Sequence, residues 1–394
     1  MAGEPLLSVR NLETQFHTDE GVVRAVDGVS FDVRRGETVC LVGESGSGKT
    51  VTGESLTRLV RSPPGEVTGG EIDFDGRNVL DMSDAELRDL RGGRVGHIFQ
   101  NPQGALNPVY TVGWQIVEAI RLHEDASKSA ARARAIDLLD RVGIPEATRR
   151  FGDYPHEFSG GMKQRVAIAM ALATNPDLLV ADEPTTALDV TIQNQILRLL
   201  GELQAEFDMS VLLITHDLGV VAEVADRVVV VYAGKVMERG DVFDVFENPS
   251  HPYTRALLRC LPGRGGRLEG IDGRLPSATD PPDGCRFHPR CAHAVDACRR
   301  GEQPPLYALD GDDHAVSCVH YGPDGDPAVV RGEGTAAVDA GTDGGYVEDR
   351  ENAGDGGHVE DDEHVEGRGR VGDDASSGDD SRHRNRGVDG GDEP

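Results

Sequence analysis

The chain has 394 residues, a length that allows two or three domains. Its formal net charge is −29 and its apolar fraction is 38%. It contains no run of 18 apolar residues and no basic N-terminal region followed by an apolar stretch, so we expect neither a membrane span nor a secretory signal. So acidic a chain is a poor candidate for broad nucleic-acid binding, which needs a basic surface. Without a secretory signal or a membrane span, we expect the protein in the cytosol. There the six cysteines should be metal ligands or buried thiols and not disulfides.

Acidic charge is spread over the whole chain. Residues 323–394 hold 21 acidic and 7 basic residues, a net charge of −14, and we expect a disordered tail there, either a solvating extension or a binding arm. The first 322 residues carry the other 15 negative charges, and the chain has 4 lysines against 36 arginines. Abundant Asp with scarce Lys is typical of halophilic proteins, because high salt screens the self-repulsion of an acidic surface. The alternative is an ordinary acidic protein with a disordered tail.

The first elements are predicted to be strands. Runs of β-forming residues, broken by Gly21, Gly28 and Gly36, predict strands over Leu7–Arg10, Val22–Asp27 and Val29–Val33. Thr38–Val42 is a short apolar run of the kind that forms a buried strand, and a glycine-rich loop and a helix should follow it. Asp75-Gly76 then indicates a hairpin over Glu71–Val79. Ser83 and Glu86 form a capping box that opens a short helix.

Residues 102–158 have a different, helical character. Helical patterns over Val112–Leu122 and Ala130–Val142 predict a helical insertion. Alternation of strands and helices resumes afterwards. Strands are predicted over Leu178–Ala181, Val211–Thr215, Arg227–Tyr232 and Lys235–Glu238, with a helix over Thr191–Glu206.

A phosphate-binding pattern follows the run at Thr38–Val42. Its residues are Gly43, Glu44, Ser45, Gly46, Ser47, Gly48, Lys49 and Thr50. The glycines let backbone N–H groups turn towards phosphate oxygens, and the N-terminus of the following helix adds a positive dipole end. We expect Lys49 to reach the β- and γ-phosphates and the Thr50 hydroxyl to bind Mg²⁺. The pattern therefore predicts binding of a nucleoside triphosphate.

Two acidic residues end the apolar run Leu178–Ala181. Asp182 and Glu183 would lie at the carboxyl edge of a parallel sheet, beside the phosphate loop. We expect Asp182 to hold Mg²⁺ through water and Glu183 to polarise the attacking water. The alternative is a strand that ends in a polar turn, but a polar turn does not explain why the acids accompany a phosphate loop.

A third motif indicates a family. Residues 158–165 read FSGGMKQR, which resembles the signature sequence of ATP-binding-cassette (ABC) ATPases, usually Leu-Ser-Gly-Gly-Gln. Phe158 stands in place of the Leu and Met162 in place of the Gln, whereas Ser159, Gly160 and Gly161 are kept. The serine hydroxyl and the backbone N–H donors that face phosphate are therefore retained.

The other elements of the ABC family occur in order. Gln100 matches the loop glutamine that senses Mg²⁺ and links to the membrane partner, and Asp189 matches the loop at the dimer seam. His216 matches the switch histidine that contacts the γ-phosphate. Phe16 is the nearest candidate for the aromatic residue that stacks on adenine, with a core role as the alternative. The resemblance implies that two domains sandwich two ATP molecules, with the phosphate loop of one facing the signature of the other.

The resemblance narrows to importer ATPases. The chain has one cassette, no long insertion and no membrane helix, which argues against translation factors, repair ATPases and exporters. Residues 99–109 resemble the glutamine loop of oligopeptide and dipeptide importer ATPases, and residues 248–258 resemble the segment after their cassette. The resemblance implies ATP-driven import of di- or oligopeptides. The alternatives are import of nickel or sugars by the same family, and a soluble ABC ATPase that acts on nucleic acid or ribosomes.

Importer membership implies several partners and a location. The partners are two integral-membrane permeases, a second ABC ATPase that is identical or a sister subunit, and, indirectly, an extracellular substrate-binding lipoprotein. No nucleic acid is expected. The chain would lie peripherally on the cytoplasmic face of the cell membrane, and its acidic composition suggests a halophilic archaeal source.

Four cysteines follow the cassette. They are Cys285, Cys291, Cys298 and Cys318. The spacing lacks the paired C-x-x-C of common zinc sites, and four thiolates suit an iron–sulfur cluster. Peptide-importer ATPases carry a similar pattern that is associated with a [4Fe–4S] cluster, which we expect here in a structural role, far in sequence from the hydrolytic residues. Zinc, unligated thiols and disulfides are the alternatives. Cys40, in a strand, and Cys260, after a helix, are expected to be buried thiols.

Together the motifs predict an α/β fold. We expect a P-loop NTPase cassette of the ABC type, with a mixed sheet core, an antiparallel β subdomain and a helical subdomain. The nucleotide-binding domain is placed at residues 1–255, with its helical subdomain at about 102–170. A Cys-containing C-terminal region of the oligopeptide-importer type is placed at 256–322, and the acidic tail at 323–394.

Overall fold

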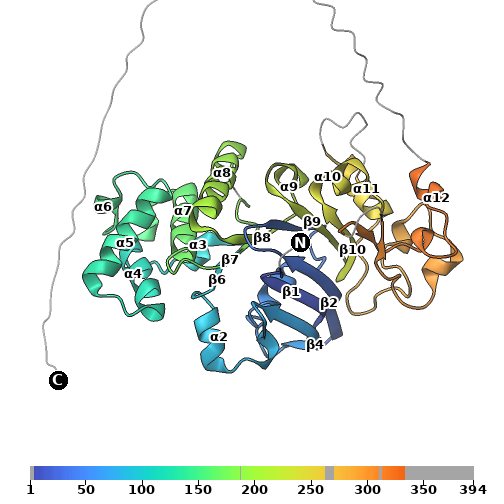
Figure 1. The fold of residues 1–394 in the computed structure, drawn as a ribbon, viewed down its shortest axis with the longest axis horizontal. Helices are drawn as coiled ribbons and strands as arrows, with labels where there is room; N and C mark the ends of the chain where they lie inside the picture. The colour runs from blue at the N-terminus through green and yellow to red at the C-terminus, as the bar shows by residue number, and fades with distance from the viewer. Residues whose placement is uncertain (1–3, 187, 262–269, 310–312, 333–394) are drawn as a thin grey trace, which may run out of the picture. The chain divides into compact units, whose positions relative to one another are not determined.

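The computed structural model describes residues 4–186, 188–261, 270–309 and 313–332 (Figure 1). The chain divides into two units, Met1–Ala337 and Val338–Pro394, and all described residues belong to the first. In the part of the chain that the structure describes, every helix is too short or too polar to span a bilayer.

A mixed sheet lies at the centre of the described fold. Its eight strands have the order β11-β12-β10-β9-β3-β8-β7-β6. They are β3 (Thr38–Val42), β6 (Val95–Ile98), β7 (Leu178–Asp182), β8 (Ser210–Thr215), β9 (Arg227–Tyr232), β10 (Lys235–Asp241), β11 (Tyr307–Ala308) and β12 (Ala315–Val316). The strands from β9 to β6 are parallel, so their carboxyl ends meet at one edge of the sheet. Strands β3, β7 and β8 are buried along their whole length, which explains their continuous apolar runs.

A second, antiparallel sheet has the order β2-β1-β4-β5. Its strands are β1 (Leu7–Thr18), β2 (Gly21–Val33), β4 (Gly65–Phe74) and β5 (Arg77–Asn78). Asp75 and Gly76 turn the chain between β4 and β5 with φ of 53° and 79°, which confirms the predicted hairpin. Gly28 lies inside β2 with φ of 84°, so the prediction that it breaks the strand is wrong.

Helices fill the segment in which the sequence predicts a helical insertion. They are α3 (Pro102–Ala105), α4 (Val112–His123), α5 (Lys128–Arg141), α6 (Ala147–Arg150) and α7 (Gly160–Ala171), and Figure 1 shows them in blue-green to green. Ile116 and Ile120 of α4 are fully buried with Leu139 of α5 and Val166 of α7. This apolar packing holds the helices together, so the signature sequence lies at the start of a well-packed helix.

The remaining helices connect the strands or follow them. They are α1 (Lys49–Ser55), α2 (Asp84–Leu90), α8 (Val190–Phe207), α9 (Leu218–Val224), α10 (Val242–Glu247), α11 (Pro252–Arg259) and α12 (Ala328–Arg331). Short 3₁₀ turns are η1 (Val79–Asp81), η2 (Pro155–Glu157), η3 (His288–Arg290), η4 (Asp296–Arg299) and η5 (Val319–Tyr321). Ser83 and Glu86 form the predicted capping box at the start of α2.

The C-terminal segment extends the central sheet. β12 pairs antiparallel with β10, so that Val316 lies opposite Glu238, and β11 pairs with β12. Glu238 is fully buried, and it accepts hydrogen bonds from the N–H groups of Ser250 and His251 over 2.8 Å each. Nε2 of His314 lies 2.8 Å from the same carboxylate. This satisfied buried acid joins the segment to the cassette.

The described fold continues ten residues past the expected start of the tail at 323. α12 buries Val330 fully against Val316 and Cys318, because its apolar side chain completes a small third core. Residues 333–394, the rest of the expected tail, lie outside the described residues.

Candidate active site

The phosphate loop lies between β3 and α1, at the carboxyl edge of the parallel strands. Gly43 and Gly48 have φ of 154° and 98°. A Cβ at Gly43 would lie 2.1 Å from the carbonyl oxygen of Val231, and one at Gly48 would lie 2.1 Å from that of Ala25. Only glycine fits such positions. The two motif glycines are therefore required by the path of the backbone.

Lys49 is buried at the start of α1, and its ammonium group turns back over the loop. Nζ donates to the carbonyl oxygens of Gly43 over 2.8 Å and of Glu44 over 3.0 Å. Burial lowers the pKa of Lys49, while the charges of Glu183, Asp182 and Glu44 oppose that shift. The lysine thus lies among loop carbonyls and nearby carboxylates.

Asp182 ends β7 beside the phosphate loop. Burial raises the pKa of Asp182, and a hydrogen bond from the Thr50 side chain opposes the rise. Oδ1 of Asp182 is buried and has no hydrogen-bond partner in the described structure. A buried carboxylate oxygen without a partner is costly, and a hydrated Mg²⁺ would satisfy it. Thr50 and Asp182 therefore fit a magnesium site.

The carboxylate of Glu183 is held by three side chains. Nδ1 of His216 lies 2.9 Å from Oε1, while Nε2 of Gln100 and the Thr186 hydroxyl each donate to Oε2 over 2.9 Å. Burial works to raise the pKa of Glu183, but these hydrogen bonds outweigh it and hold the pKa below the ordinary value. Its backbone has φ of 45°, a conformation that is rare for non-glycine residues and concentrates at functional sites. The structure thus presents an oriented, ionised carboxylate.

The signature lies at the N-terminus of α7, beside the N-terminus of α8. Ser159 caps α7, with Oγ accepting from the N–H of Met162 over 3.3 Å, and Asp189 caps α8 in the same way. A Cβ at Gly161 would lie 2.9 Å from the side chain of Ile192, so the two helix starts are adjacent. Within the described parts of the chain, no hydrogen bond joins the signature to the phosphate loop.

Phe16 lies on β1 and is half-buried. Its Cε1 would lie 2.8 Å from a Cβ at Gly65 of β4, so the ring packs closely over that glycine. Stacking on adenine stays a prediction for this residue.

Three residues around the site were not predicted from the sequence. Thr186 donates to Glu183, the Tyr253 hydroxyl accepts from the N–H of Glu44 over 2.9 Å, and Arg290 pairs with the Glu44 carboxylate at 2.9 Å. Tyr253 lies in residues 248–258, which the sequence analysis compared with importer ATPases without assigning this residue a role, whereas Thr186 and Arg290 lie outside the motifs used there. Arg290 directly precedes Cys291, so the cysteine segment, although far in sequence from the hydrolytic residues, reaches the phosphate loop.

None of the six cysteines, all of which the structure describes, forms a disulfide. Cys40 is buried as expected, but Cys260 is exposed because it follows the last buried turn of α11. Burial raises the pKa of Cys285 to about 11 and that of Cys318 to about 12, and charges on other cysteines of the set add to both shifts. Within the set, the N–H of Cys285 donates to the carbonyl oxygen of Cys298 over 3.0 Å, so these two residues are adjacent. Among the described residues, no three or more His, Cys, Asp or Glu side chains are grouped so that they could hold a metal ion.

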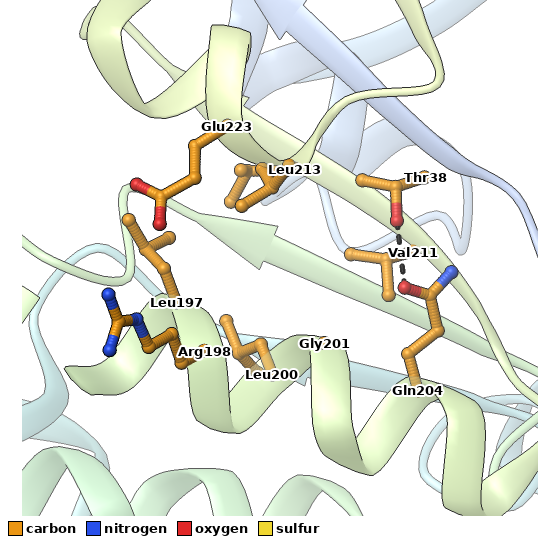
Figure 2. Close-up of a pocket in the computed structure, with 10 residues that line it drawn as sticks. Thr38, Leu197, Arg198, Leu200, Gly201, Gln204, Val211, Leu213 and Glu223 are labelled. Atoms are coloured by element: carbon orange, nitrogen blue, oxygen red, sulfur yellow. Dashed lines mark hydrogen bonds between the residues drawn. The ribbon is translucent and has the colours of Figure 1, made fainter. Parts of the chain in front are cut away.

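A cavity of about 280 Å³ lies apart from these residues, between α8, α9 and the central sheet (Figure 2). Leu197 and Leu200 of α8 face Val211 and Leu213 of β8 across it. Thr38 closes one end by donating to Gln204 over 2.9 Å. No predicted site residue lines this cavity, so its apolar volume does not mark the catalytic centre.

Two family models match the chain, one in the cassette and one in the C-terminal segment. A family model described as ABC transporter matches residues 26–186, and one described as oligopeptide/dipeptide transporter, C-terminal region, matches residues 237–298. The dipeptide transport ATP-binding protein DppD of Bacillus subtilis (strain 168) is 49% identical over 333 residues, which cover 84% of this chain and 99% of that protein. DppD of Escherichia coli (strain K12) is 50% identical over 319 residues, covering 80% and 96%.

A solved structure shows the same fold. The dimeric post-hydrolysis state of the ATP-binding cassette MJ0796, bound to ADP and Pi, matches with a TM-score of 0.54 and 30% identity, covering 60% of this chain and 98% of that one. The sheet order, the phosphate loop and these relatives agree, and the chain belongs to the ABC transporter ATPases, in the oligopeptide/dipeptide transporter family.

Proposed function

We propose that the chain is the ATP-hydrolysing subunit of an importer of di- or oligopeptides. The observation that carries this proposal is the Glu183 carboxylate, which His216 and Gln100 hold at the sheet edge where the phosphate loop lies. The substrate class rests on relatives that are named dipeptide transport proteins and are about half identical in sequence. The chain would thus be the motor of a peptide translocase.

ATP binds, in this proposal, at residues 43–50, with adenine on Phe16. Backbone N–H groups of the loop and Lys49 bind the phosphates. Mg²⁺ would be held by Thr50, Gln100 and, through water, Asp182, and would neutralise phosphate charge there. Because Gln100 donates to Glu183 in the structure, its role as a ligand requires its side chain to turn.

Glu183 is proposed as the general base that takes a proton from the attacking water. Its lowered pKa keeps the carboxylate ionised at neutral pH, and its donors fix the direction of its oxygens. His216 has an exposed side chain beside it and is proposed to contact the γ-phosphate. The group as a whole orients water for attack on phosphorus, the main task in phosphoryl transfer.

A second ATPase completes each site in this proposal. The signature residues Ser159, Gly160, Gly161 and Met162 make no hydrogen bond to their own phosphate loop within the described residues, so they are free to face the loop of a partner. Asp189 lies beside them at the seam. The partner is a second copy or a sister subunit, and ATP-driven closure of the pair supplies the motion.

An exposed aromatic patch beside the glutamine loop is proposed to receive the permeases. Phe99, Val109, Tyr110 and Trp114 are each more than 40% exposed, and the rings of Tyr110 and Trp114 stack at 4.1 Å. The stacked rings of Tyr110 and Trp114, with Val109 next to them in the sequence, form an exposed apolar group of the kind that marks an interaction surface. Docking there would place the chain on the cytoplasmic face of the membrane, with the substrate-binding lipoprotein on the other side.

The cysteine segment is proposed to hold a [4Fe–4S] cluster. Burial raises the pKa of Cys285, Cys291 and Cys318, and backbone hydrogen bonds from the residue two positions later oppose the rise in each. Such N–H donors stabilise thiolates, the form that binds iron. No three of the described thiols are grouped so that they could hold a metal ion, so the proposal rests on the presence of four cysteines in the segment and on these backbone donors.

The domain boundaries are proposed with one change. The nucleotide-binding domain covers residues 1–255 with its helical subdomain at about 102–170, and the C-terminal region begins at 256. Because α12 packs on that region, we extend it from 322 to 332.

The proposal is tested by affinity purification of the tagged full chain from native membranes in high salt, followed by mass spectrometry. Two multi-span permeases and a lipid-anchored binding protein are expected. Trp114→Ala should lose them, whereas Leu122→Ala, a change at an exposed residue of the same helix, should keep them. Recovery of ribosomal or DNA-repair proteins without permeases would overturn the transport function.

A further inference from the structure

The guanidinium group of Arg290 joins three segments at the phosphate loop. Nη1 donates to both carboxylate oxygens of Glu44, over 2.9 and 3.1 Å, and to the hydroxyl of Tyr232 over 3.2 Å. Nε and Nη2 donate to the carbonyl oxygens of Asp272 and Ile271 over 2.7 and 2.9 Å. The Arg290 side chain is only 5% exposed. An arginine that is buried and uses all three nitrogens in this way has a fixed position.

Two further contacts hold the loop from outside its motif. The hydroxyl of Tyr253 accepts from the N–H of Glu44 over 2.9 Å, and the rings of Tyr253 and Tyr232 lie 4.6 Å apart. A Cβ at Gly46 would lie 3.5 Å from the side chain of Leu275, so the C-terminal segment touches the loop directly. The first half of the phosphate loop therefore rests partly on residues beyond the cassette motifs.

Glu44 is an acidic residue on a loop whose ligand carries several negative charges. Its carboxylate is close enough to Lys49 to oppose the lowering of the lysine pKa. A carboxylate released from Arg290 would compete with phosphate for Lys49 and would repel the phosphates directly. The pairing with Arg290 prevents both effects.

We propose that Arg290 is a positioning residue of the ATP site, which holds the Glu44 carboxylate away from Lys49 and from the phosphates. The inference rests on the proposed binding of ATP at residues 43–50. If the inference holds, ATP affinity depends on the C-terminal segment. Arg290, which belongs to that segment, lies 246 positions after Glu44 in the sequence.

The test compares Arg290→Met with the wild-type full chain. Methionine keeps most of the side-chain volume and removes the charge. The Kd for ATP, measured by calorimetry, and the KM are expected to rise about fivefold, the effect of losing a partly exposed ion pair worth about 1 kcal/mol. The kcat should change less than twofold, because Glu183 and His216 keep their contacts. Adding Glu44→Gln to Arg290→Met removes the competing carboxylate and should restore KM to within twofold of wild type.

Three more variants keep the result decisive. Arg34→Met breaks a comparable bidentate pair, in which Arg34 donates to both carboxylate oxygens of Asp313 over 2.9 Å. This pair includes no residue of the phosphate loop, so the KM of the Arg34→Met variant should be unchanged. Lys49→Ala should weaken ATP binding; if it does not, the assignment of the ATP site fails rather than the role of Arg290. Arg290→Gln, which serves if Arg290→Met does not fold, also removes the charge and should raise KM about fivefold. An unchanged KM in the variant that folds, or a double variant no better than the single one, would each overturn the proposal.

Discussion

Nδ1 of His216 lies 2.9 Å from Oε1 of Glu183, and this contact joins the ends of two neighbouring strands. Glu183 directly follows β7 and His216 directly follows β8. The two strands are parallel with Asp182 opposite Ile214, whose carbonyl accepts from the N–H of Glu183 over 2.8 Å. The register of the sheet therefore sets the position of the acid and the histidine.

Thr186→Val is expected to change the pH dependence of turnover. The substitution removes one of the hydrogen bonds that hold the pKa of Glu183 low. The pKa then rises, so the carboxylate is protonated at a higher pH and loses its function as a base earlier on acidification. The acid limb of the kcat profile should move to higher pH, measured as ATP turnover across the acidic range.

Thr185→Val is the matched control for that profile. Thr185 lies in the same turn, and its hydroxyl is not among the described groups that bond Glu183. Its acid limb should coincide with that of the wild type. If the acid limb shifts equally in both variants, the effect comes from a change in the turn and not from loss of the Thr186 hydroxyl, and the prediction is contradicted.

Gly201→Ala is expected to stabilise the fold. Gly201 lies in the middle of α8 on the wall of the cavity in Figure 2, and a Cβ there would meet no atom within 4 Å. Alanine should raise the free energy of unfolding by about 1 kcal/mol and Tm by about 2–4 °C. Gly113→Ala in α4 is the control, because its Cβ would lie 2.3 Å from the Phe151 ring and should destabilise the protein. Thermal unfolding measures the Tm of both variants. A lower Tm for Gly201→Ala than for the wild type would contradict the expectation.

Cys298→Ser is expected to lower the content of bound iron. The wild-type chain, purified without oxygen, should contain about four irons and four acid-labile sulfides if it holds a [4Fe–4S] cluster. Loss of one thiolate ligand should reduce both contents well below half of the wild-type values. Cys260→Ser, a change at an exposed cysteine outside the set, should leave them unchanged. Zinc in place of iron, or wild-type protein without metal, would contradict the cluster.

Local patterns predicted most of the cassette. The strand at Thr38–Val42, the hairpin at Asp75-Gly76 and the capping box at Ser83 are all present, because each depends on neighbouring residues. The phosphate loop and the two acids at the end of β7 could be placed together, since the carboxyl ends of parallel strands meet at one edge.

Contacts between distant residues could not be predicted in this way. β11 and β12 have two residues each, too few to show a periodic pattern, and they are strands only because β10 offers an open edge. Gly28 lies within a strand at positive φ. From the sequence alone, such a glycine cannot be distinguished from one that ends the strand. The pairing of Arg290 with Glu44 depends on tertiary packing and has no local signal.

The most direct test of hydrolysis by this site is a comparison of ATP binding and turnover in Glu183→Gln. Glutamine keeps the size of the side chain but cannot accept the proton from water. We expect the variant to bind ATP, to accumulate as a dimer on size-exclusion chromatography, and to lose turnover by about 10²- to 10³-fold. Turnover at the wild-type rate would show that Glu183 is not the base.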